Sequence, residues 1–152
     1  MANEKKRMKI SSKSEEIKMK GIITFSESIV VENNFYLEGN LFVCGDLTIE
    51  GNLTINGKLF VAGNLIVNGY LDVEKDLFSK NITVKEDIQI RGSINVKGDF
   101  NINGDAFLTG KSSNVVNGNF TVKGSVIVFD RLVVNGHIKV EGDLKVYEEL
   151  FA

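Results

Sequence analysis

The stretch LTIEGNLTINGKLFVAGNLIVNG, residues 47–69, repeats one six-residue pattern: apolar, any, apolar, any, Gly, polar. The same hexad returns in IQIRGSINVKGDFNINGD, residues 88–105. All 15 glycines of the chain fall at its fifth position once two small register slips are allowed. A short fixed period of this kind indicates a solenoid, which has two ends, long faces and no natural pocket.

Within each hexad the first and third positions are apolar and the second usually is not, which predicts a short strand with one buried face. Glycine at the fifth position tolerates a positive φ, so we expect the chain to turn there. Pairs such as Asn56-Gly57 also suit tight hairpins, but strands of three or four residues would bury little as hairpins. The hexads therefore predict an all-β, single-stranded parallel β-helix.

The spacing of three phenylalanines predicts the length of one coil. Phe42, Phe60 and Phe78 occupy the second position of hexads 18 residues apart, so three hexads form one coil of triangular section. Thr24 precedes them in this column. After a one-residue deletion at LFSKN and a two-residue insertion near Ser112-Ser113, we expect it to continue through Asn95, Val115, Val133 and Phe151. The other two faces are mostly polar, and the irregular hexads LDVEKD, LFSKN, AFLTGKSS and VIVFDR predict bulges or loose corners.

The charge distribution divides the chain into a charged N-terminal arm, residues 1–16, and a β-helix domain, residues 17–152. The net charge is −2, yet residues 1–20 hold seven basic and three acidic side chains, a net charge of +4. A basic arm can contact anionic lipid at about 1 kcal/mol per Lys or Arg, and a solvated tail is the alternative. The candidate membrane-contact residues are Lys5, Lys6, Arg7, Met8, Lys9 and Ile10. No apolar run of 18 residues and no secretory signal is visible, so we expect a cytoplasmic protein, with peripheral contact to the inner face of the membrane left open.

Two surfaces are candidates for contacts with other molecules. The hexad LKVYEE is followed directly by Leu150-Phe151-Ala152, which predicts an uncovered last strand with unpaired backbone groups. The predicted end-to-end interface comprises Leu144, Val146, Leu150, Phe151, Ile17, Met19 and Ile23. The second surface is the phenylalanine ridge, defined as Phe42, Phe60 and Phe78, which predicts lateral contact with another rod or a partner unless the face bends inward or residues 1–16 cover it.

The sequence offers little that could carry catalysis. His137 is the only histidine and occupies a corner, and Cys44 has no His or Cys at ligand spacing. Gly-Asp pairs such as Gly45-Asp46 recur, but calcium-binding β-rolls use a nine-residue period. We therefore expect no catalytic residues, no metal, no cofactor and no nucleic-acid partner.

The repeat, as in LTIEGNLTINGKLFVAG and INVKGDFNINGD, resembles that of the bactofilins, polymer-forming bacterial cytoskeletal proteins, over residues 17–152. The resemblance implies a right-handed β-helix, filaments built by end-to-end stacking, and membrane attachment through the N-terminal tail. Left-handed β-helix acyltransferases differ, because they place a small residue where this chain has Leu47 and Leu53. The leading hypothesis is thus a self-assembling scaffold that binds itself and recruits other proteins along its faces. The alternatives are a crystal, coat layer or fibre formed by lateral packing, and a hexapeptide-repeat acyltransferase with His137 as its base.

Overall fold

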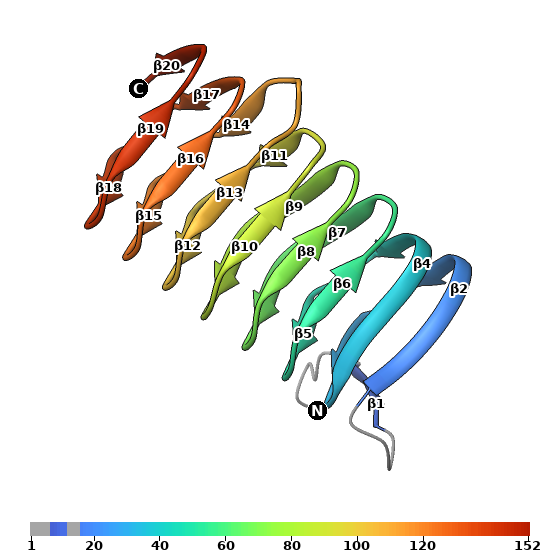
Figure 1. Ribbon diagram of the computed structural model, residues 1–152. Helices are drawn as coiled ribbons and strands as arrows, with labels where there is room; N and C mark the ends of the chain where they lie inside the picture. The colour runs from blue at the N-terminus through green and yellow to red at the C-terminus, as the bar shows by residue number, and fades with distance from the viewer. Residues whose placement is uncertain (1–6, 12–15) are drawn as a thin grey trace.

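The protein is a β-solenoid. The computed structural model describes residues 7–11 and 16–152, and these residues form strands and corners without a helix. The strands wind about one axis in about eight turns, and every strand pairing is parallel (Figure 1). The N-terminal coil lies at one end of the rod and the C-terminal coil at the other (Figure 1). The predicted all-β parallel solenoid is therefore confirmed.

The pairings sort the strands into three faces, which correspond to the three hexads of a coil. Face 1 contains the C-terminal parts of β2 (Glu16–Phe25) and β4 (Asn34–Val43), the N-terminal parts of β7 (Leu59–Val67) and β9 (Leu77–Val84), and β11 (Ile94–Val96), β14 (Asn114–Val116), β17 (Arg131–Val134) and β20 (Glu149–Phe151). Face 2 contains β1 (Arg7–Ile10), β3 (Ser28–Val31), β5 (Leu47–Ile49), the C-terminal parts of β7 and β9, β12 (Phe100–Ile102), β15 (Phe120–Val122) and β18 (Ile138–Val140). Face 3 contains the N-terminal parts of β2 and β4, β6 (Leu53–Ile55), β8 (Leu71–Val73), β10 (Ile88–Ile90), β13 (Ala106–Leu108), β16 (Val126–Val128) and β19 (Leu144–Val146).

The strand register confirms a coil of three hexads. Phe42 pairs with Phe60, and Phe60 pairs with Phe78, as their 18-residue spacing predicts. The column continues across both register slips and contains, in order, Thr24, Phe42, Phe60, Phe78, Asn95, Val115, Val133 and Phe151. The deletion at LFSKN is absorbed in a register shift between β7 and β9, at the corner that joins faces 1 and 2.

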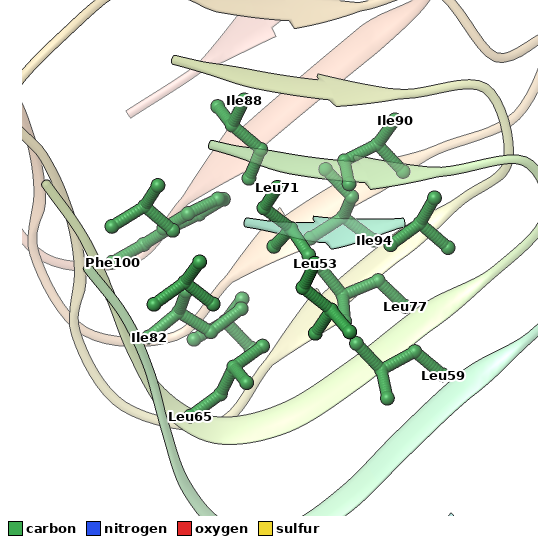
Figure 2. Packing of buried hydrophobic residues seen from close by; sticks show 14 of the residues in the cluster. Leu53, Leu59, Leu65, Leu71, Leu77, Ile82, Ile88, Ile90, Ile94 and Phe100 are labelled. Carbon is green, nitrogen blue, oxygen red and sulfur yellow. The ribbon is translucent and has the colours of Figure 1, made fainter. Parts of the chain in front are cut away.

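The core is a stack of inward side chains from the first and third hexad positions. Leu53, Leu71 and Ile88 pair in successive coils on face 3 and are all about 1% exposed or less (Figure 2). Side chains from the other two faces meet them at the axis, so each coil seals the apolar surface of its neighbours. Burial of a large apolar side chain contributes about 1.5–3 kcal/mol, and the repeated stack therefore supplies the main stabilisation of the rod.

The structural role predicted for glycine is wrong at most corners. Among the described residues a positive φ occurs only at Gly21 and Gly39, so the other corners turn without left-handed backbone. The need for glycine is instead steric, because a Cβ at Gly69 would meet Asn52 Oδ1 and the Gly51 carbonyl of the preceding coil. At such corners glycine is needed because the backbones of adjacent coils approach too closely there for a side chain.

The residue at the sixth hexad position forms a second repeated contact, which we call the corner ladder. Its side-chain oxygen accepts a hydrogen bond from the backbone N–H of the matching residue one coil later. Asn34 Oδ1 accepts from Asn52 at 2.8 Å, and Asn52 Oδ1 accepts from Tyr70 at 2.9 Å. Asp87 and Asp99 Oδ1 act in the same way toward Asp105 and Asn119, each at 2.8 Å. The ladder ties successive coils together at their corners, where no strand pairing exists.

Candidate assembly surfaces

The last coil exposes side chains at inward positions that are buried in the inner coils. Leu132 and Leu150 are paired at the same inward position of face 1, but Leu132 is 0% exposed and Leu150 is 44% exposed. On face 3, Val126 is buried, whereas its partner Leu144 is 37% exposed. Val146 is half-buried at the other inward position of β19. The open section of the core at this end is therefore apolar.

The structure places Phe151 differently from the rest of this predicted interface. Phe151 occupies the outward position of β20, pairs with Val133, and is 49% exposed. The Arg131 guanidinium lies over its ring, 5.8 Å from the centroid, and Arg131 Nη2 also lies 3.2 Å from Glu149 Oε1. Phe151 thus lines the rim of the last coil rather than its open core section.

The first coil also presents apolar side chains at inward positions. Ile17, Met19 and Ile23 are inward residues of β2, and each is half-buried where it packs against the core. Strand β2 pairs with β4 over ten residues, from Glu16 to Phe25. The structure therefore places all three N-terminal residues of the predicted end-to-end interface on one strand at this end of the rod (Figure 1).

Part of the expected N-terminal arm belongs to the first coil. Strand β1, residues 7–10, pairs in parallel with β3, and Ile10 packs against the core. Lys9 points outward, with its Nζ 2.7 Å from Glu32 Oε1. Lys5 and Lys6 lie outside the described residues. Within residues 7–11 and 16–152, no helix is long and apolar enough to cross a membrane.

The phenylalanine ridge forms a continuous stack on the outer surface of face 1. Phe60 and Phe78 are parallel, with ring centroids 4.7 Å apart, and Phe42 is tilted against Phe60 at 6.3 Å. Phe60 is 38% exposed and the other two rings are half-buried. Lys97 Nζ lies 5.4 Å from the Phe78 centroid, within cation–π range. The ridge points away from the core.

A second aromatic group lies near the C-terminal coil, and the sequence analysis did not single it out. Phe129 and Tyr147 stand one coil apart at the corner between faces 3 and 1, in an edge-to-face contact of 5.5 Å. They are 50% and 57% exposed, and Lys145 Nζ lies 5.5 Å from the Tyr147 centroid. The signal was present in the sequence, because both residues occupy the fourth hexad position, where neighbouring hexads have polar side chains.

The residues considered for chemistry lie apart on the surface. His137 is an exposed corner residue whose backbone N–H donates to Asn119 Oδ1 at 2.9 Å. Cys44 is an exposed free thiol at another corner. Of the residues that the structure describes, no three His, Cys, Asp or Glu side chains are grouped so as to hold a metal ion. The recurrent Gly-Asp pairs instead supply the corner ladder, as Asp99 and Asp105 do.

Comparison with known proteins gives one match. The family model described as "Bactofilin: Polymer-forming cytoskeletal" matches residues 13–113, about two thirds of the chain. No curated protein and no solved structure matches the chain. The matched span includes the phenylalanine ridge, whereas the last coil lies beyond it.

Proposed function

Because this chain belongs to the bactofilin family of polymer-forming cytoskeletal proteins, we propose that it is a non-catalytic scaffold whose rods stack end to end into filaments. The observation that supports this proposal most directly is the exposure of inward apolar side chains at the last coil. The inward positions of faces 3 and 1, which are buried in the inner coils, carry Leu144 and Leu150 in the last coil, and these side chains are about 40% exposed. A second copy of the chain offers an apolar coil of the same cross-section and covers both side chains.

The two open ends are suited to joining because each combines apolar side chains with strand edges. In β19, Leu144 and Val146 face the axis, and among the strands that the structure describes β19 pairs with β16 alone. Addition of a strand from another molecule satisfies such edge groups and places apolar residues against apolar residues. Ile17, Met19 and Ile23 give the first coil the same two properties.

The decisive experiment is negative-stain electron microscopy of the 152-residue chain and its Val146→Arg variant. A cation in the open core section prevents close stacking, so we expect filaments from the parent chain and single rods from the variant. The β-rich circular dichroism should stay the same, because Val146 is only half-buried and the arginine side chain can reach solvent at the open end. Phe151→Arg should act in the same direction through the rim of the coil.

Thr121→Arg is the matched control, because it adds the same charge on the outward position of face 2 and should leave filaments intact. A parent protein that remains a monodisperse monomer at high concentration would refute end-to-end assembly. Filaments that survive Val146→Arg would show that the C-terminal coil is not the joint.

We also propose that the basic N-terminal segment contacts anionic lipid. Lys9 is exposed although it pairs with Glu32, and Lys5 and Lys6 precede it in the chain. Each cation near an anionic surface contributes about 1 kcal/mol. Co-sedimentation with phosphatidylserine vesicles should fall in the Lys5→Glu, Lys6→Glu double variant, whereas phosphatidylcholine vesicles should bind neither protein. Equal binding of the parent and the variant would refute the contact.

A second candidate function is a layer or fibre built by lateral packing of rods. The stacked, outward rings of the phenylalanine ridge favour it, since an apolar stripe on the side of a rod loses water only by lateral contact. Phe60→Arg should remove sheets or bundles and spare single filaments, which separates this mode from end-to-end stacking.

A further inference from the structure

The corner ladder between faces 1 and 2 ends at the only histidine of the chain. Ser28 Oγ accepts a hydrogen bond from the Asp46 N–H at 2.9 Å, and Asp46 Oδ1 accepts from the Asn64 N–H at 2.8 Å. The contact recurs in later coils of this column, and in the last of them Asn119 Oδ1 accepts from the His137 N–H at 2.9 Å. Each such residue is one rung, and its side chain offers an acceptor to the coil that follows.

His137 is the last rung of this column among the described residues, because no later coil follows the one that it begins. That coil contains β18, β19 and β20 and lies at the C-terminal end of the rod (Figure 1). It also holds Leu144 and Leu150, the exposed inward residues of the open core section. A second copy that stacks on this section therefore brings its backbone to the place where the next rung would be.

Histidine differs from the earlier rungs because its ability to accept a hydrogen bond depends on pH. The neutral imidazole has one ring nitrogen that accepts, whereas both nitrogens of the charged ring are donors. Histidine side chains change between these forms between about pH 5 and 8, a range in which asparagine and exposed aspartate keep their charge state. When the ring is charged, His137 has no acceptor for a backbone N–H, and it directs a donor at a donor.

The groups around His137 do not change their charge in this range. Lys139 lies two residues later in the same coil, at the outward position of β18, and stays positive. The described groups that face His137 from the coils below it are Asn117, Asn119 and Thr121 in the preceding coil, and Lys97 and Asp99 two coils away. The charge that changes at this corner is therefore that of His137.

We propose that His137 makes the end-to-end joint sensitive to pH. The neutral imidazole accepts a hydrogen bond from the backbone of the stacked copy, and protonation of the ring removes this bond and weakens the joint. The contribution is present above the range in which histidine titrates and is lost as the pH falls through it. This inference rests on the proposed end-to-end scaffold and adds a regulation of the same joint.

The test compares the parent chain with its His137→Asn variant at about pH 7.5 and about pH 5.5, on either side of the histidine range. Asparagine is the residue of the preceding rung, and it accepts a hydrogen bond at both pH values. The critical concentration for assembly is measured by light scattering and pelleting, and circular dichroism at both pH values checks the fold. Loss of one hydrogen bond should raise the critical concentration of the parent about fivefold or more at the lower pH. The variant should assemble equally at both.

Two further variants separate the rung from a general effect of charge. His137→Lys has a fixed charge and no acceptor, and it should assemble weakly at both pH values. Asn135→His in the His137→Asn background is the matched control. It places an imidazole at the same corner but at the fourth hexad position, outside the ladder, so it should not restore the dependence on pH.

Three results would overturn the inference: equal assembly of the parent at both pH values, an equal dependence on pH in His137→Asn, or a dependence restored by Asn135→His. Absence of filaments from the parent at both pH values would refute the end-to-end scaffold and this inference with it. Filaments that ignore pH would refute the inference alone, so the two failures are distinguishable.

Discussion

Leu132 and Leu150 pair at one inward position in successive coils, but only Leu132 is sealed from water. The difference comes from the number of neighbouring coils. Leu132 has a coil on each side, at Asn114 and at Leu150, whereas Leu150 has one. Substitution of these two leucines can therefore distinguish the contribution of core packing to folding, at Leu132, from its contribution to assembly, at Leu150.

The first prediction uses this pair. Leu132→Ala should lower the free energy of unfolding by about 2–5 kcal/mol, because it leaves a cavity in a sealed core. Leu150→Ala should cost the isolated rod much less and should weaken filament formation instead. Urea denaturation of both variants at low protein concentration measures the effect on folding, and light scattering measures the effect on filament formation. Equal destabilisation by the two changes would contradict it.

The second prediction concerns the corner ladder. Asn52→Ala removes the acceptor for the Tyr70 N–H and should lower the free energy of unfolding by about 1 kcal/mol. Asn103→Ala, at an exposed fourth hexad position, is the control and should change stability by less than about 0.5 kcal/mol. If thermal unfolding shows the two variants to be equally stable, the ladder does not stabilise the rod.

The third prediction tests the steric reason for glycine. A Cβ at Gly69 would lie against Asn52 Oδ1 and 2.9 Å from the Gly51 carbonyl oxygen. Gly69→Ala should therefore lower the free energy of unfolding by about 1–3 kcal/mol. Part of the clash disappears when Asn52 is alanine, so the double variant should be less destabilised than the sum of the two single changes. Strict additivity in denaturant unfolding would argue against this contact.

The fourth prediction is a dependence of stability on pH. The pKa of Asp76 is lowered from its ordinary value of 3.8, chiefly by a hydrogen bond from the Ser93 N–H at 2.9 Å, with Lys58 and Lys75 contributing. A lowered folded-state pKa means that the unfolded chain binds this proton more readily, so the stabilisation is present above the ordinary value. It is lost as the pH falls below about 4 and through the lowered pKa of the folded protein.

Asp76→Asn keeps a side-chain acceptor for Ser93 but removes the titrating group. Thermal unfolding of the two proteins between pH 7 and pH 2 should show a smaller loss of stability on acidification in the variant, because the lowered pKa of Asp76 no longer couples folding to protonation. Parallel curves for the two proteins would show that Asp76 does not couple folding to protonation.

The sequence predicts the coil and the register well because its signals are periodic. The 18-residue spacing of Phe42, Phe60 and Phe78 correctly places Asn95 and Val115 in the same column, even across the deletion and the insertion. The position of a residue in a solenoid follows from its place in the six-residue repeat, and each new hexad shows that place again. The prediction therefore survives two local irregularities.

The reasons for the repeated residues were harder to predict, because they depend on contacts between coils. Glycine was assigned to a positive φ, whereas at Gly69 the constraint is the close approach of Gly51 in the preceding coil. The asparagines and aspartates at the sixth hexad position form the corner ladder, and only the three-dimensional stacking brings their oxygens to a backbone N–H 18 or 20 residues away.

The uniform register has a consequence for the dimensions of the molecule. Each inner coil contacts only the coil before it and the coil after it, and both contacts are made by equivalent positions. Removal of one whole 18-residue turn, such as residues 47–64, joins two chain segments that already share that register. The terminal coils would keep their chemistry while the rod became shorter by one strand spacing, about 4.8 Å. The length of each subunit, and with it the axial repeat of any filament, is therefore adjustable in fixed steps.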